Sequence, residues 1–163
     1  MIFKKDSYVF HKRVGICRVD DIAPFPGDDS GNLYYVLAPL YGDDKGNILH
    51  VPLGNAISLS LPLTKEEAGV IVRDWPNPDE NHYVVDSKKR KTLYEESLGS
   101  GSIVTLAPLL EGAMQRKKRD GHLNSMDGQF VSHAEPLIYG SIAHALNMDY
   151  ANVREYIINN LGK

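Results

Sequence analysis

Residues 60–81, SLPLTKEEAGVIVRDWPNPDEN, decide the expected fold because the sequence pattern changes from strand to helix within them. Thr64 and Glu67 have the spacing of a capping box, in which each side chain bonds the backbone N–H of the other residue and so begins a helix. We expect this helix to run to about Asp74. The proline-containing run 75–81 then ends it, because proline disfavours helical geometry at the preceding residue. This run is the predicted domain boundary.

The sequence before residue 60 has the composition of short antiparallel strands. Aromatic and β-branched residues such as Tyr35 and Val36 suit a pleated surface. Proline, glycine and aspartate cluster at 24–31 and 42–46, where they favour tight turns. The predicted strands cover residues 7–12, 16–22, 33–37 and 47–51. Closely spaced strands with such turns predict a small barrel or a curled sheet.

The sequence after residue 81 is predicted to be helical to its end. The expected helices cover residues 86–98, 102–119, 125–146 and 149–161, with Ser102 and Asp149 as N-caps. Gly99 to Gly101 should stop the first of them. Pro108 and Pro136 should each kink or interrupt a helix, because proline lacks a backbone donor and clashes with the preceding turn.

These patterns predict an α+β protein with a small N-terminal β-barrel and an all-α C-terminal domain. The expected divisions are a barrel over 1–62, a helix and linker over 63–81, and a helical domain over 82–163. With 42% apolar and 24% charged residues, the composition is that of a globular protein with a core. Residues 1–10 contain lysines and an aspartate where a signal peptide would be apolar, so we expect a cytoplasmic protein with no membrane segment.

No spacing of reactive residues points to catalysis, a cofactor or a metal. The six histidines lack the close spacing of a helical zinc motif, and Cys17 is the only cysteine. Gly99-Ser100-Gly101-Ser102 lacks the Gly-x-Ser-x-Gly spacing of a nucleophile elbow. We therefore expect a protein that is not an enzyme, and interpret Cys17 as a buried strand residue.

Two runs of basic residues stand out although the net charge is −3. The runs are Lys88-Lys89-Arg90-Lys91, at the start of one expected helix, and Arg116-Lys117-Lys118-Arg119, at the end of the next. Four consecutive residues cannot all face a core, so part of each run should reach solvent, where it would attract DNA phosphates. The second run also complements the negative end of its helix, which requires no ligand.

The sequence resembles the CarD-like transcription regulators over nearly its whole length. The N-terminal residues that carry the resemblance are Met1, Ile2, Phe3, Lys4, Asp6, Tyr8, Val9, Gly15, Val19, Ile22, Tyr34, Tyr35, Val36, Leu37, Val51, Pro52, Asn55 and Ala56. The same domain occurs in the transcription-repair coupling factor. In the C-terminal half, Leu98-Gly99-Ser100-Gly101 and the apolar helix ending in a basic run are similar to the family's helical domain.

The resemblance implies a Tudor-like domain that binds the RNA polymerase β subunit and a helical domain that touches promoter DNA near the upstream edge of the transcription bubble. The polymerase contact in such proteins is an edge pairing between strands. Carried over by position, the contacting strand holds Ile48, Leu49, His50 and Val51. His50 stands where relatives often have arginine, which implies a weaker or pH-dependent contact.

The DNA contact implied by the resemblance involves the two basic runs and the residue before the first of them. Ser87 lies close to where many relatives have a tryptophan that can wedge at the minor groove. Trp75 is about a dozen residues earlier, so we expect it to be a core residue or a linker anchor. The DNA contacts should then be mainly to phosphates, which position a protein without reading sequence. The expected DNA-binding residues are Ser87, Lys88, Lys89, Arg90, Lys91, Arg116, Lys117, Lys118 and Arg119.

The sequence leaves open one alternative function, that of a protein-interaction module with no role at DNA. The barrel could bind a protein other than polymerase, with helices that only scaffold it. Replacement of Lys88 to Lys91 by alanine would then leave function unchanged.

Overall fold

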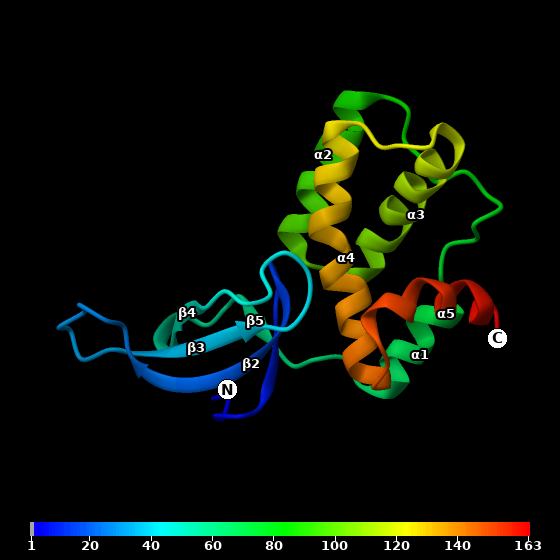
Figure 1. The fold of residues 1–163 in the computed structure, drawn as a ribbon. Helices are drawn as coiled ribbons and strands as arrows, with labels where there is room; N and C mark the ends of the chain where they lie inside the picture. Colours follow the sequence, from blue (N-terminus) through cyan, green and yellow to red (C-terminus); the bar gives the residue numbers. More distant parts are fainter. Residues whose placement is uncertain (1) are drawn as a thin grey trace.

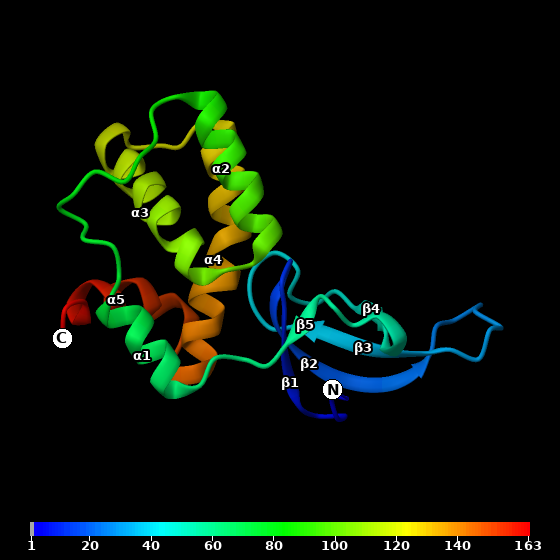
Figure 2. The same cartoon turned by 180° about the vertical axis from the view of Figure 1, so that it is seen from behind.

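The computed structural model describes residues 2–163 and places a curled half-barrel of strands beside five α-helices (Figure 1). The α+β class and the order of strands before helices are confirmed. Met1, with which the family resemblance begins, lies outside the described residues. Seen from behind, the chain that follows α1 (Lys65–Arg73) crosses the outside of the helical half to reach the start of α2 (Ser87–Ser100) (Figure 2).

The half-barrel is one antiparallel sheet in the order β4-β3-β2-β1-β5. Its strands are β1 (Tyr8–His11), β2 (Gly15–Pro24), β3 (Leu33–Pro39), β4 (Leu49–Pro52) and β5 (Leu59–Ser60). The first four correspond to the predicted strands, with ends that differ by no more than two residues. The fifth, β5, was not predicted, because two residues carry no periodic pattern and its pairing with β1 is a tertiary contact.

The concave face of the sheet holds its own apolar core. Tyr35 lies opposite Val51 on β4 and opposite Ile22 on β2, and is almost fully buried. The Tyr35 hydroxyl oxygen accepts a hydrogen bond from the Phe3 backbone N–H at 3.1 Å. Cys17 is buried in the same cluster, as expected. Along β3 and β4, alternate residues face outward, which leaves His50 half-exposed.

The helices are α1, α2, α3 (Ile103–Asp120), α4 (Ser125–Leu146) and α5 (Val153–Asn160), with a 3-10 turn at Tyr150–Asn152. The capping box of Thr64 and Glu67 is confirmed, with bonds of 2.9 and 3.1 Å. Asp149 caps the 3-10 turn rather than α5. Ser102 precedes α3 but makes no side-chain cap bond.

Of the two effects expected at the prolines, a kink or an interruption, interruption is wrong, because α3 continues through Pro108 and α4 continues through Pro136. The burial of both helices against their neighbours offsets the missing backbone bond, since tertiary packing supplies most helical stability in proteins. Pro136 is itself buried against the β-half, where its ring occupies the space that a Cβ on Gly42 would need.

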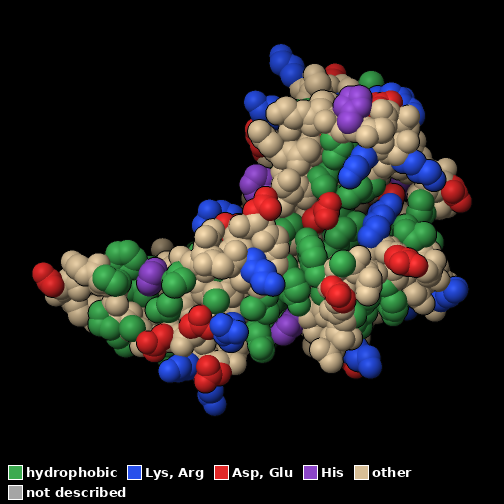
Figure 3. Space-filling model, in the orientation of Figure 1, with side chains coloured by type: hydrophobic (Ala, Val, Ile, Leu, Met, Phe, Trp, Pro, Cys, Tyr) green, Lys and Arg blue, Asp and Glu red, His purple; other side chains and the backbone are tan. Residues whose placement is uncertain are grey.

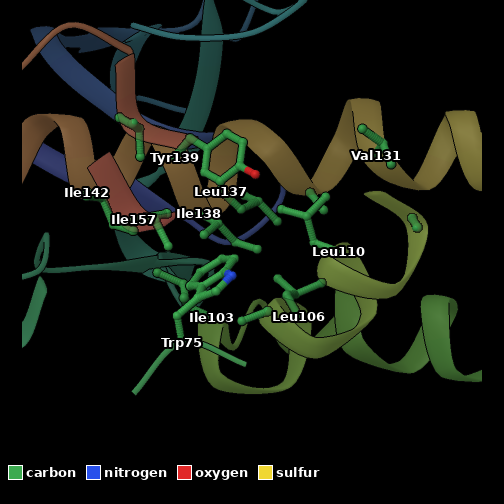
Figure 4. Close-up of a cluster of buried hydrophobic side chains, with 14 of the residues drawn as sticks. Trp75, Ile103, Leu106, Leu110, Val131, Leu137, Ile138, Tyr139, Ile142 and Ile157 are labelled. Carbon is green, nitrogen blue, oxygen red and sulfur yellow. The ribbon is translucent and has the colours of Figure 1, made fainter. Parts of the chain in front are cut away.

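The core of the helical half includes residues from the stretch expected to be a linker. Val72 of α1 and Trp75 join the apolar cluster formed by α3, α4 and α5, where Trp75 lies beside Ile103 (Figure 4). The Gly162 backbone N–H donates to the Arg73 carbonyl at 2.8 Å, which ties the C-terminus to α1. The run 75–81 therefore lies within the helical half and does not separate two domains. Trp75 is a core residue, one of the two roles expected for it.

Candidate protein and nucleic-acid interfaces

The expected polymerase-binding residues lie at one edge of the sheet. β4 pairs with β3 on one side only, with His50 opposite Val36 and Leu49 opposite Leu37. No strand of residues 2–163 pairs with its other side. An edge strand presents unpaired backbone donors and acceptors that another strand can bind. Ile48 precedes the strand and is exposed, whereas Val51 is buried and supports the strand from within.

The outer face near β4 carries apolar and aromatic side chains. Phe25 lies edge-on to His50, with ring centroids 4.6 Å apart, and tilts toward Tyr34 at 5.7 Å. Phe25, Leu33 and Ile48 are all exposed. Figure 3 shows hydrophobic side chains gathered on this lobe of the barrel. An exposed apolar patch beside a free strand edge is typical of a protein-binding surface.

The two basic runs are far apart in the sequence but meet at one end of the helical half. The start of α2, the end of α3 and the start of α4 lie together there, at the end far from the barrel (Figure 1). Several Lys and Arg side chains lie around the edge of this end in the space-filling view (Figure 3). Tyr83 joins the runs, because the guanidinium of Arg90 lies 4.6 Å and that of Arg116 4.0 Å from its ring centroid.

Arg90 must be removed from the expected DNA-binding residues. Its side chain is only 6% exposed, and its Nε donates to Asp127 Oδ1 at 2.9 Å. Its Nη1 donates to the carbonyls of Val84 and Val85, so the guanidinium is committed within the protein. The cause is helical periodicity: in a run of four, the residue that faces the bundle is buried while its neighbours reach solvent.

Asp127, near the start of α4, organises this end of the bundle. Its carboxylate is fully buried and also accepts hydrogen bonds from the Tyr83 hydroxyl at 2.7 Å and the Tyr94 hydroxyl at 2.9 Å. Burial and the bond to Asp127 raise the pKa of both tyrosines, so each remains a donor at neutral pH. Sequence reasoning missed Asp127, Tyr83 and Tyr94, because nothing in their spacing indicates that they meet.

The remaining expected DNA-binding residues differ in their exposure to solvent and in whether they form ion pairs within the protein. Arg116 is partly buried and lies 3.8 Å from Asp120, and Arg119 pairs with Asp120 at 2.8 Å. Ser87 is exposed at the first position of α2. The lysines of both runs are exposed, and none forms an ion pair with a described residue: Lys88, Lys89, Lys91, Lys117 and Lys118. These lysines are the cations most accessible to a phosphate.

Within residues 2–163, no three histidine, cysteine, aspartate or glutamate side chains are grouped so as to hold a metal ion. None of the helices in that range combines the length and the apolar character needed to cross a membrane. Comparison of the chain with models of known protein families and with curated protein sequences found no match.

Proposed function

We propose that this protein is a CarD-like bacterial transcription regulator, without enzymatic activity, that acts in the cytoplasm. In this proposal the half-barrel is a Tudor-like domain whose strand β4 binds the RNA polymerase β subunit. The basic end of the helical half contacts promoter DNA near the upstream edge of the bubble. The observation that carries the proposal is one chain with a free strand edge on its β-half and two converging basic runs on its helical half.

The free edge of β4 supports the polymerase contact. An added strand would gain backbone hydrogen bonds along residues 49–52, with Ile48 and His50 available for selectivity. Phe25 lies against the ring of His50 and would extend the contact beyond the strand itself. The contact therefore combines sequence-independent backbone pairing with a small apolar surface.

The converging lysines support the DNA contact. Lys88, Lys89 and Lys91 lie on α2, and Lys117 and Lys118 lie on α3. The same two runs contribute Arg90 and Arg116, whose guanidinium groups both pack on Tyr83. Such cations bind phosphates and release counterions without reading base sequence. A protein that contacts both polymerase and open promoter DNA shifts the equilibrium between closed and open complexes only by its differential affinity for the two.

Binding to an isolated β-lobe fragment of RNA polymerase tests the polymerase contact. The variant Leu49→Asp/His50→Glu should bind at least about tenfold more weakly than the wild type, because charges on the edge oppose strand addition. The matched control is Ile57→Asp/Ser60→Glu, which adds two acids near the other edge of the sheet and should bind normally. Absence of wild-type binding, or equal loss in both variants, would reject the polymerase contact.

The apolar patch of Phe25, Leu33 and Ile48 favours a second candidate, a protein-interaction module without a DNA role. The triple variant Lys88→Ala/Lys89→Ala/Lys91→Ala distinguishes the two, and it omits Arg90 because that residue is buried. Loss of DNA binding with retained β-lobe binding supports the regulator. If the triple variant keeps the full regulatory function of the wild type, the protein-interaction module without a DNA role is supported.

A further inference from the structure

A groove made of two adjacent hollows lies between α1 and α3, on a part of the helical half that the proposed function does not use. Two hollows of about 460 and 320 Å³ form it. Both are lined by Val70 and Ile71 of α1 and by Ile103 and Val104 of α3, so they are adjacent. One hollow reaches Phe10 of the β-half, and the other reaches the buried ring of Trp75.

The walls of the groove are apolar and partly uncovered. Val104 is 74% exposed and Val70 is 45% exposed, although each stands on a helix whose inner face is well packed. Ile103 and Trp75 lie side by side in the core below (Figure 4). Exposed apolar side chains on both walls of a groove are typical of a surface that binds another molecule.

The charged residues that line the groove are all acidic. Glu67 lines one hollow and Asp74 lines the other, while no lysine or arginine lines either. Glu67 lies in the first turn of α1 and Asp74 caps its C-terminus, so their backbones are roughly 10 Å apart along the helix axis. Asp74 pairs with Arg73, but both side chains are more than half exposed, and such surface pairs are weak and exchange partners easily.

We propose that this groove binds an amphipathic helix of a partner protein, with apolar residues facing Val70 and Val104 and basic residues spaced to meet Glu67 and Asp74. Two helices form the walls, and a helix laid between them presents apolar anchors at i, i+3, i+4 and i+7. Basic residues at i and i+7 would match the spacing of the two acidic residues at the ends of α1. A strand is a poorer occupant, because the nearby sheet edge, β5, has only two residues.

Fluorescence anisotropy with a labelled synthetic helix tests the proposal. The probe is a peptide of leucine, alanine and lysine of about 15 residues, long enough for measurable helix formation in water. Its lysines are placed at i and i+7 beside a leucine face. Val104→Lys should weaken binding about tenfold, the loss expected when one valine is no longer buried. The matched control is Val85→Lys, which makes the same change at a valine that is 75% exposed outside the groove.

The carboxylates are tested separately with Glu67→Gln/Asp74→Asn, in which glutamine can still complete the capping box with Thr64. This variant should weaken binding severalfold and reduce its dependence on salt. A peptide with glutamate in place of lysine should not bind the wild type.

Three results would overturn the proposal: no binding by the wild type, equal binding of both peptides, or equal affinity of the Val104→Lys and Val85→Lys variants. Analytical ultracentrifugation would show whether the groove binds a second copy of the chain instead. A wild-type dimer that is absent in Val104→Lys would assign the groove to a second copy of this chain. None of these results depends on polymerase or DNA binding.

Discussion

Arg90 and Asp127 lie 37 residues apart in the sequence, yet their side chains form a buried ion pair of 2.9 Å. The pair joins the start of α2 to the start of α4. Tyr83 packs over the guanidinium and donates its hydroxyl to the same carboxylate. The exposed lysines on either side of Arg90 therefore depend on a buried anchor for their position.

Replacement of Arg90 by alanine should be strongly destabilising. Removal of one partner leaves a buried charge uncompensated, at a cost of about 3–5 kcal/mol in the free energy of unfolding. Urea denaturation measures this cost. Lys89→Ala, next to it in the sequence and exposed, should change the free energy of unfolding by less than about 0.5 kcal/mol. Similar values for the two variants would contradict the assignment of Arg90 as a buried anchor.

The salt dependence of DNA binding should identify the lysines that touch phosphates. Removal of one lysine–phosphate contact should reduce the slope of log affinity against log salt by about 0.9. The variant Lys88→Ala/Lys89→Ala/Lys91→Ala should therefore lower the slope by about 2.7 if all three lysines bind DNA. Lys4→Ala/Lys5→Ala/Lys12→Ala removes the same charge from the β-half and should leave the slope unchanged. Equal effects would mean that overall charge, rather than the basic end, governs binding.

A substitution at Gly42 should loosen the contact between the two halves. Gly42 has a φ of +78°, and a Cβ there would overlap the ring carbons of Pro136. Gly46 has a similar φ of +95° but open space around it. We expect both Gly→Ala variants to carry the backbone cost of about 1–2 kcal/mol, and Gly42→Ala to lose about 1–3 kcal/mol more through overpacking. Thermal unfolding of both variants checks this difference, and equal losses would exclude a close contact with Pro136.

Protonation of Glu111 should account for part of the loss of folding stability in acid. Burial raises the pKa of this carboxyl, but hydrogen bonds from Arg154 and Trp75 outweigh burial and hold the pKa below its usual value of 4.5. A carboxyl with a lowered pKa in the folded state contributes stability above its unfolded pKa, and this contribution disappears as the pH falls through the folded value.

Glu111→Gln should accordingly be less stable than the wild type at pH 7 and should lose less stability on acidification below about pH 4.5. Urea midpoints across this range measure the effect. Glu155→Gln, at an exposed position on α5, is the control and should follow the wild-type pH profile. A wild-type profile for Glu111→Gln would mean that the ion pair between the buried Glu111 and the partly exposed Arg154 does not contribute to acid sensitivity.

Local patterns predicted much of the fold because they act over a few residues. The side chains of Thr64 and Glu67 reach each other's backbone, so their spacing alone predicts the start of α1. The turn-forming residues between strands likewise predicted four of the five strands. Of the kink or interruption expected at Pro136, interruption is wrong, because contacts with distant parts of the chain hold α4 together.

The candidate interfaces, like the fold, could be predicted only in part from the sequence. The sequence by itself determined the strand and helix pattern and the existence of two basic runs. Only the tertiary structure decided that β4 is a sheet edge, that both runs share one end of the bundle, and that Arg90 turns inward to Asp127. Short-range hydrogen bonds and helical periodicity are determined by residues close together in the sequence. The burial of a side chain and the pairing of strands depend on which distant segments pack together.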